Sequence, residues 1–179
     1  MHSQKDAIGN NPLMISIDCR RNTCRRGAFG KPGKLDIAPM RKKDLARIFK
    51  IEQETISGWT RSQLEEELLQ PAGFQYTARI STTTEIVAFL LGRLVDGEAE
   101  ILKLAVAKRF RRQHIGDRLL KYSLNRLRQQ GVKCCFLECR ATNMAAQGIY
   151  AKNGFTTTGV RKGYYTGPSE DAVLMMKKF

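Results

Sequence analysis

The chain has 179 residues and a formal net charge of +14, from 31 Lys and Arg against 17 Asp and Glu. A chain of this length can form one domain that buries about two thirds of its unfolded surface without disulfide bonds. The charge predicts an anionic partner, such as a nucleotide cofactor, RNA or a polyphosphate, but it does not decide between them.

The five cysteines argue against both a disulfide framework and a metal site. An odd number without a secretion signal favours a reducing compartment, so we expect a cytoplasmic protein. Alternation along a strand would send Cys134 to one face and Cys135 and Cys139 to the other, so they cannot easily converge on one ion and we expect no metal. No apolar stretch reaches the roughly 20 residues of a membrane helix, so we expect no membrane partner.

Residues 1–34 are expected to form a basic, mostly disordered arm, and residues 35–179 the folded domain. The arm has seven Lys or Arg against two Asp, and its apolar run Leu13–Ile17 is too short to form a core. It could bind RNA. A solvated tail, or a true start at Met14, is the simpler explanation because charge runs are usually solvated.

The domain is predicted to begin with a short strand at Leu35–Ile37 and two helices. The first helix starts at Asp44 and places apolar residues near helical spacing at positions 45, 48, 49 and 51. The second runs from about Arg61 to Leu69, and Trp59 lies at the joint between the two helices. Three strands follow, at Phe74–Ile80, Glu85–Val95 and Ile101–Val106. They are rich in β-branched and aromatic residues and are separated by turn signals.

An amphipathic helix is predicted from Arg118 to Gln130. Positions 116, 119, 120, 123, 124 and 127 carry small or apolar residues, so this stripe should dock on a sheet. The chain returns as a strand at Cys134–Cys139, which strand-helix-strand connectivity makes parallel to the strand at Ile101–Val106. A last helix at Asn143–Lys152 and a strand pair at Phe155–Tyr165 and Ala172–Met176 complete the domain.

These elements predict an α/β (α+β) fold: a mixed, mostly antiparallel sheet of six to seven strands with helices on both faces. The order is one strand, two helices, three strands, helix, strand, helix and two strands.

The turn before the helix at Arg118–Gln130 is a candidate anion site. It carries Lys108, Arg109, Arg111 and Arg112, and it opens into a helix whose first N–H groups have no intrahelical partner. The helix dipole and the side-chain charges both favour an anion there. On these residues alone, a solvated basic loop explains the turn equally well.

The same turn resembles the pyrophosphate loop of the GCN5-related N-acetyltransferases (the GNAT superfamily). The family pattern is Gln or Arg, two residues, Gly, one residue, then Gly or Ala. Arg111 and Gly116 fit this pattern, whereas His114 stands where the first Gly is expected. His114 could hold the pyrophosphate away from the backbone or could add an imidazole donor beside it.

Three further stretches look like those of the bacterial ribosomal-protein-alanine N-acetyltransferases within this superfamily. They are Leu137–Asn143 with Ile149–Phe155, Arg161–Tyr165, and Glu170–Ala172. The resemblance covers about residues 35–176 and implies a GNAT fold with acetyl-CoA (coenzyme A) as the cofactor. The cofactor-binding residues that it implies are Leu104, Ala105, Val106, Arg111, Arg112, Gln113, His114, Ile115, Gly116, Asp117 and Asn143. Backbone groups of Leu104–Val106 would hold the pantetheine amides as an added strand does.

The resemblance also implies the catalytic groups. Glu138 would be the general base that takes the ammonium proton, directly or through a water, and the alternative is a surface carboxylate paired with Arg140. Tyr150 would be the general acid that protonates the thiolate, and the alternative is a core tyrosine. Trp59, Tyr164 and Tyr165 would line the acceptor groove.

The predicted function is transfer of an acetyl group to a protein N-terminal amine, most simply the N-terminal Ala of a small-subunit ribosomal protein. One alternative keeps the fold and takes a lysine, polyamine or other small amine, because fold is a poor guide to acceptor. Another is a non-catalytic nucleic-acid-binding module. RNA contact through the basic surface is compatible with both classes, and the oligomeric state is left open.

Overall fold

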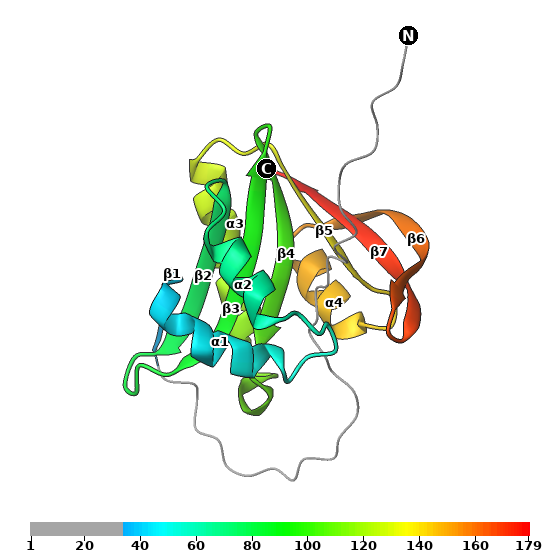
Figure 1. Cartoon of the computed structure of the whole chain (residues 1–179). Helices are drawn as coiled ribbons and strands as arrows, with labels where there is room; N and C mark the ends of the chain where they lie inside the picture. Colours follow the sequence, from blue (N-terminus) through cyan, green and yellow to red (C-terminus); the bar gives the residue numbers. More distant parts are fainter. Residues whose placement is uncertain (1–33) are drawn as a thin grey trace.

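The structure is a computed structural model that describes residues 34–179 (Figure 1). The expectation of a disordered arm over residues 1–34 therefore lies outside the described residues, apart from Lys34. Seven strands form one sheet in the order β1-β2-β3-β4-β5-β7-β6. Their bounds are Leu35–Pro39 (β1), Gly73–Ile80 (β2), Ile86–Val95 (β3), Glu98–Val106 (β4), Cys134–Arg140 (β5), Thr156–Thr166 (β6) and Ser169–Lys178 (β7).

The helices are Leu45–Glu52 (α1), Arg61–Leu68 (α2), Ile115–Gln129 (α3) and Met144–Lys152 (α4), with 3-10 turns at Lys42–Asp44 (η1) and Lys108–Phe110 (η2). The predicted order of elements is confirmed. The sheet is mixed, because β4 pairs with β5 in parallel and the other neighbours are antiparallel. Within residues 34–179, no helix is long and apolar enough to cross a membrane.

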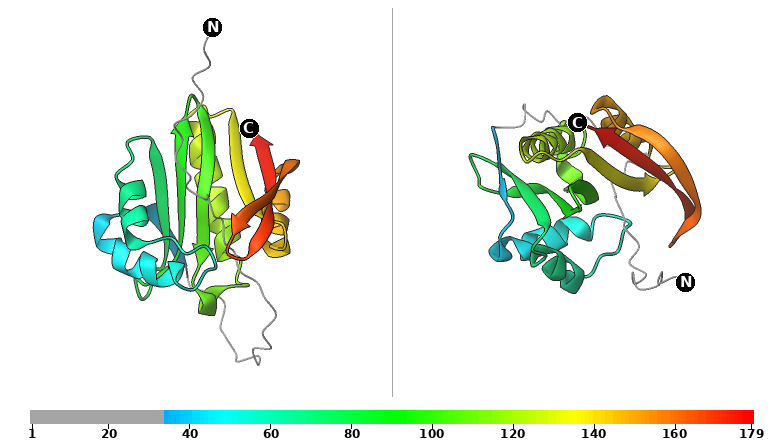
Figure 2. Two further views of the ribbon diagram at one scale, coloured as in Figure 1. Left: turned by 45° about the vertical axis from the view of Figure 1, so that its right-hand side comes forward. Right: turned by 90° about the horizontal axis from the view of Figure 1, so that it is seen from above.

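Helices cover both faces of the sheet, as predicted (Figures 1 and 2). Central strand β3 shows why, since it is an almost unbroken apolar run that buries side chains on both sides. Val87 and Leu90 belong to a cluster shared with α3 and α4, whereas Phe89 and Leu91 belong to a second cluster shared with α1 and α2. The protein therefore has two apolar layers, one on each face.

Helix α3 begins at Ile115, three residues before the predicted start, and it buries the predicted stripe. Leu119, Leu120, Leu124 and Leu127 are all buried against the sheet. Each such side chain contributes about 1.5–3 kcal/mol relative to an exposed one. This face of α3 thus fixes the position of the basic turn at its N-terminus.

Strands β4 and β5 separate halfway along their length. Only Ala99, Glu100 and Ile101 pair with β5 among the described residues, although the two strands continue to Val106 and Arg140. Figure 2 shows β5, β6 and β7 turning away from the other half of the sheet. Within residues 34–179, the second half of β4 therefore has β3 as a neighbour on one side and no strand on the other.

A β-bulge lies where the separation begins. Lys103 pairs with Leu91 and Ile101 pairs with Gly92, so Leu102 is an extra residue on β4. A bulge breaks the alternation of side chains along the strand. As a result Leu102 joins the α1 and α2 layer, and Lys103 contacts Glu52 of α1 on that same face.

Candidate active site at the parting of two strands

The basic turn forms a cradle at the N-terminus of α3. His114 is the N-cap of α3 and has a left-handed backbone with φ 59°, and Arg112 is also left-handed with φ 63°. Left-handed residues in such a loop turn N–H groups toward one concave side, which is a common geometry for binding phosphate. His114 thus adopts the conformation that favours glycine, which explains why the family pattern has Gly at this position.

A pocket of about 340 Å³ opens beside this cradle. Its walls are the end of β4 at Val106, the loop and first turn of α3, and one side of α4 that includes Gly148 and Ile149. Arg111, Arg112, His114, Ile115, Gly116 and Asp117 all border it, whereas Gln113 is not among its lining residues. The structure therefore brings together most of the predicted cofactor residues.

Arg111 also connects the cradle to the opposite face of the sheet. Its Nε donates to the Val106 carbonyl at 3.0 Å, and its Nη2 donates to the Glu54 carbonyl at 3.0 Å. Glu54 lies in the connection between α1 and α2. Arg111 therefore ties the end of β4 to that connection.

Asp117 joins α3 to α4. Its carboxylate accepts hydrogen bonds from Asn153 at 2.7 Å and from Lys121 and Lys152 at 3.1 Å. Burial alone would raise the pKa of Asp117, but these three donors outweigh it and lower the pKa to about 2. The side chain predicted to bind cofactor thus already holds the two helices that border the pocket.

Asn143 is the N-cap of α4, where its side chain accepts a hydrogen bond from the Ala146 N–H at 3.2 Å. Capping alone accounts for an Asn at this position. Leu104, Ala105 and Val106 lie on β4 beyond its last pair with β5. This edge of β4 is where an added strand could bind.

Glu138 lies on β5 and faces the same side of the sheet as α1 and α2. Its partner is Arg161 of β6, at 2.9 Å, and its side chain is 11% exposed. The alternative pairing with Arg140 is wrong, because Arg140 pairs with Glu170 at 3.0 Å. The Oε2 of Glu138 is buried and has no hydrogen-bond partner in the described part of the chain.

Tyr150 comes from α4 on the other side of β5 and is fully buried. Its ring packs edge-to-face on Phe155, which agrees with a core tyrosine. Its hydroxyl has no partner among residues 34–179, although buried hydroxyls are normally hydrogen-bonded. Burial, followed by the nearby Cys139 and Tyr165, raises the pKa of Tyr150 well above its usual range.

Tyr165 lies between these two groups. It is fully buried, and the Arg140 guanidinium stacks 4.3 Å from its ring centre. Burial raises the pKa of Tyr165, and Cys139 and the Glu138 carboxylate raise it further. The charge of Glu138 contributes to the raised pKa of Tyr165, and Tyr165 contributes to the raised pKa of Tyr150, which agrees with a location of all three side chains around β5.

The predicted acceptor residues are less exposed than a groove lining would suggest. Trp59 is 4% exposed and Tyr165 is fully buried, whereas Tyr164 is half-buried and contacts Arg161. The stretch Arg161–Tyr165 of β6 contains a bulge, in which Gly163 has a left-handed backbone and donates its N–H to the Asp171 carboxylate. Arg140 holds the hairpin beside it by donating to the Gly167 and Pro168 carbonyls.

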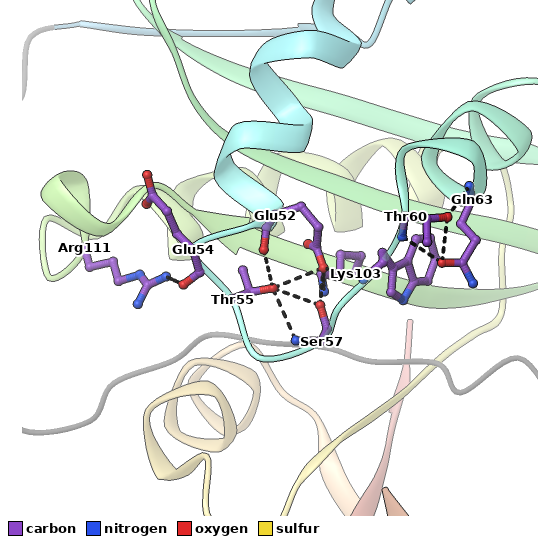
Figure 3. Close-up of polar contacts among 9 residues, drawn as sticks. Glu52, Glu54, Thr55, Ser57, Thr60, Gln63, Lys103 and Arg111 are labelled. Atoms are coloured by element: carbon purple, nitrogen blue, oxygen red, sulfur yellow. Dashed lines mark hydrogen bonds and ion pairs between the residues drawn. The ribbon is translucent and has the colours of Figure 1, made fainter. Parts of the chain in front are cut away.

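Sequence reasoning missed one buried ion pair near the site. Lys103 of β4 and Glu52 of α1 lie 2.8 Å apart and are almost completely buried (Figure 3). The available signal was a lysine inside the apolar run Ile101–Val106, which a buried strand accepts only with a charged partner. Among residues 34–179, no group of three or more His, Cys, Asp or Glu is placed to hold a metal ion.

Comparison with known proteins identifies the family. The model of the acetyltransferase (GNAT) family matches residues 43–155. A [ribosomal protein bS18]-alanine N-acetyltransferase of Haemophilus ducreyi is 32% identical over 139 residues, which cover 75% of this chain and 93% of that protein. The Bacillus subtilis protein named putative [ribosomal protein bS18]-alanine N-acetyltransferase is 29% identical over 143 residues, covering 79% and 94%.

Solved structures agree with this assignment. The crystal structure of the ribosomal-protein-S18-alanine N-acetyltransferase from Escherichia coli superposes with a TM-score of 0.75 at 27% identity, covering 81% of this chain and 94% of that chain. The structure of Ard1 from Thermoplasma volcanium gives 0.74 at 26% identity, covering 80% and 97%. The chain belongs to the acetyltransferase (GNAT) family and is an N-acetyltransferase that uses acetyl-CoA.

Proposed function

We propose that this enzyme acetylates the α-amine of a protein N-terminus, and that its acceptor is the N-terminal Ala of a small-subunit ribosomal protein. The relatives from Haemophilus ducreyi and Escherichia coli carry that activity in their names and align over three quarters or more of this chain. The observation that carries the reaction is the cluster of Glu138, Tyr165 and Tyr150 where β4 and β5 separate.

Three features fit acetyl-CoA on the α3 and α4 side of this cluster. The left-handed loop and the α3 N-terminus offer N–H donors to the pyrophosphate. The edge of β4 at Leu104–Val106 offers backbone groups to the pantetheine amides. The Tyr150 hydroxyl is buried without a hydrogen-bond partner among residues 34–179, so it could bind a further polar atom. Acetyl-CoA supplies the acetyl group there as a thioester.

Glu138 acts as the general base in this scheme. An N-terminal ammonium must lose a proton before its nitrogen can attack, and the Oε2 of Glu138 lacks any hydrogen bond in the described part of the chain. Arg161 holds the other carboxylate oxygen in place. The proton moves to Glu138, directly or through one water.

Tyr150 acts as the general acid on the opposite side of β5. As the new N–C bond forms and the C–S bond breaks, the departing sulfur needs a proton. A tyrosine hydroxyl is protonated at neutral pH and so has a proton to donate, although the burial that raises the pKa of Tyr150 makes it a weaker acid until a thiolate is buried beside it. Glu138 and Tyr150 thus serve the two ends of the reaction from the two faces of the sheet.

The acceptor enters from the α1 and α2 face, between the connection of those helices and the β6–β7 hairpin. Trp59, Tyr164 and Tyr165 border this side. The net charge of +14 is a better match for an RNA-bearing particle than for an isolated basic tail. We therefore place the enzyme in the cytoplasm, where it meets a ribosomal protein close to RNA.

The test is thiol release from acetyl-CoA with a panel of acceptors. We expect a peptide with a free N-terminal Ala to react faster than the same peptide with a blocked N-terminus and an internal Lys, and faster than polyamines. Preference for lysine or small amines would contradict the proposed acceptor. RNA binding that weakens steeply with salt, without thiol release for any acceptor, would support a nucleic-acid-binding module instead.

A further inference from the structure

Several residues of the connection between α1 and α2 donate hydrogen bonds to one carboxylate oxygen, the Oε1 of Glu52 (Figure 3). The Oε1 of Glu52 accepts from Lys103 Nζ at 2.8 Å and from the hydroxyls of Ser57 and Thr55, the latter at 3.1 Å. The backbone N–H of Trp59 also donates to this atom at 3.3 Å. Residues 53–60 are thus folded around Glu52, the last residue of α1.

Lys103 is the one cation in this cluster, and its burial needs an explanation. Its side chain is 0% exposed and that of Glu52 is 1% exposed. Removing both charges from water is expensive, and apolar residues of similar volume are often as stable in such a place. The β4 bulge aims Lys103 at this face, where the reaction scheme gives it no role.

The connection built on Glu52 also contacts the cofactor side. Arg111 donates to the Glu54 carbonyl at 3.0 Å, and the Lys108 N–H donates to the Glu54 carboxylate. At its far end, Thr60 and Gln63 form a capping box that starts α2. The connection is therefore fixed at both ends and in the middle, on the face that carries Glu138.

We propose that Lys103 is a positioning residue of the acceptor site: its ammonium group holds Glu52, and through Glu52 it holds residues 53–60 in the arrangement that binds the acceptor. This inference rests on the proposed entry of the acceptor from the α1 and α2 face. It predicts that Lys103 affects the binding of the acceptor far more than the chemical step or the binding of acetyl-CoA.

The charge of Lys103 offers a direct handle on this arrangement. Burial lowers the pKa of Lys103 to about 8, against the attraction of Glu52, and Arg140 of β5 lowers it further. Glu52 and Arg140 are the charged groups that face it, and the connection adds two hydroxyls and the Trp59 ring, whose centre lies 5.8 Å from Nζ. Above about pH 8 the ammonium becomes neutral, and the hold on Glu52 weakens.

Trp59 is the only tryptophan in the chain and lies within residues 53–60, so its fluorescence reports on the conformation of this connection without any substrate. In the wild type we expect the emission to change with a midpoint of about pH 8. Lys103→Met should show the high-pH emission already at neutral pH. Lys103→Arg should keep the low-pH emission, because arginine stays charged.

The kinetic arm uses an Ala-initiated peptide at one neutral pH, so that titration of the acceptor amine does not interfere. For Lys103→Met we expect KM for the peptide to rise about tenfold or more, with kcat and KM for acetyl-CoA changed less than about threefold. Lys103→Arg should have a peptide KM close to that of the wild type, because it keeps the positive charge. Arg79→Met is the matched control, because it breaks an ion pair with Asp44 at the other end of α1.

A drop in the melting temperature of Lys103→Met without a change in peptide KM would overturn the proposal. So would a Lys103→Met emission that matches the wild type at neutral pH. If Lys103→Met does not fold, Glu52→Gln replaces it with the same expected rise in peptide KM, because it weakens the same contact. If the wild type does not acetylate the peptide but acetylates another amine, the proposed acceptor is wrong. The effect of Lys103→Met on KM for that amine then tests the positioning role of Lys103.

Discussion

The two faces of the sheet handle charge in different ways. The α3 and α4 face, where we propose that the cofactor binds, offers backbone N–H groups of a left-handed loop, a helix N-terminus and an apolar pocket. The α1 and α2 face instead holds charged groups in matched pairs, and in each pair the carboxylate side chain is largely buried. These are Lys103 with Glu52, Glu138 with Arg161, and Arg140 with Glu170.

This difference follows from what each face has to do. An anion can be bound by dipoles that never change their protonation, so the cofactor side needs few buried charges. The proposed base on the other face is a carboxylate, and removing a carboxylate from water costs free energy that a nearby cation offsets. Buried charged pairs therefore concentrate on the face where we propose that the acceptor enters.

The largest expected effect is that of Glu138→Gln on turnover, which should fall about ten- to ten-thousandfold at neutral pH, the range for a lost general base. Affinity for acetyl-CoA should stay near that of the wild type, because the change lies on the acceptor face. The loss should shrink as pH rises, since a free α-amine has a pKa of about 7.7–8.0 and then deprotonates itself. Steady-state kinetics from pH 6 to about 9 measure this.

Glu100→Gln is the matched control for that experiment. Glu100 lies on β4 in the part that pairs with β5. Burial raises the pKa of Glu100, and the nearby charge of Glu138 raises it further. A full loss of activity in Glu100→Gln with none in Glu138→Gln would move the base to the neighbouring strand.

Next comes Tyr150→Phe, for which we expect turnover to fall about a hundredfold. Its stability should hold or rise slightly, because the substitution keeps the ring and removes a buried hydroxyl that has no partner in the described chain. Thermal unfolding and single-turnover kinetics measure the two properties separately. Unchanged turnover with lower stability would identify Tyr150 as a core residue only.

Gly148→Leu should separate folding from cofactor binding on the other face. A Cβ added at Gly148 meets nothing within 4 Å, and the residue lines the pocket. Replacing a glycine inside a helix by a good helix former stabilises it by about 0.5–1 kcal/mol. We therefore expect a higher melting temperature together with an acetyl-CoA KM raised about tenfold. Ala151→Leu is the control, because Ala151 is exposed on the same helix and does not line the pocket.

Asp117→Asn should have the smallest effect, which is on stability. The pKa of Asp117 is lowered from 3.8 to about 2, so its contribution is complete above 3.8 and is lost as pH falls through about 2. The side chains of Lys121 and Lys152 are 51% and 56% exposed, so solvent screening reduces the loss at neutral pH to about 1–2 kcal/mol. Urea unfolding at pH 7 and at about pH 3 measures this: the difference in the free energy of unfolding between variant and wild type should be smaller at the lower pH.

Asp36→Asn, on the exposed side of β1, gives the baseline for removing one negative charge. If that variant loses as much stability as Asp117→Asn, net charge and not the staple between α3 and α4 accounts for the effect.

The features predictable from sequence were those encoded locally. The order of elements, the parallel strand after α3, the cap at Asn143 and the basic turn each depend on neighbouring residues. The features that the sequence did not predict depend on pairing between segments that are distant along the chain. An alternating pattern does not reveal the bulge at Leu102, which comes from the register with β3.

The partners of buried charges escaped for the same reason. Arg140 is two residues from Glu138 and on the same side of the strand, yet it binds Glu170 after the chain has passed through α4 and β6. Lys103 and Glu52 are 51 positions apart, and the two meet only once α1 lies across β4. Spacing rules work along one element, and they do not choose partners between elements.

The parting of β4 and β5 also gives the sheet a mechanical seam. Among residues 34–179 three residue pairs join one half to the other, so we expect the amides that face the gap to exchange hydrogen faster than those inside β3. A ligand that binds along the edge of β4 would supply the missing partners. Occupancy of the seam should therefore slow exchange on both strands and add to the resistance of the whole sheet to unfolding, in proportion to the logarithm of ligand concentration.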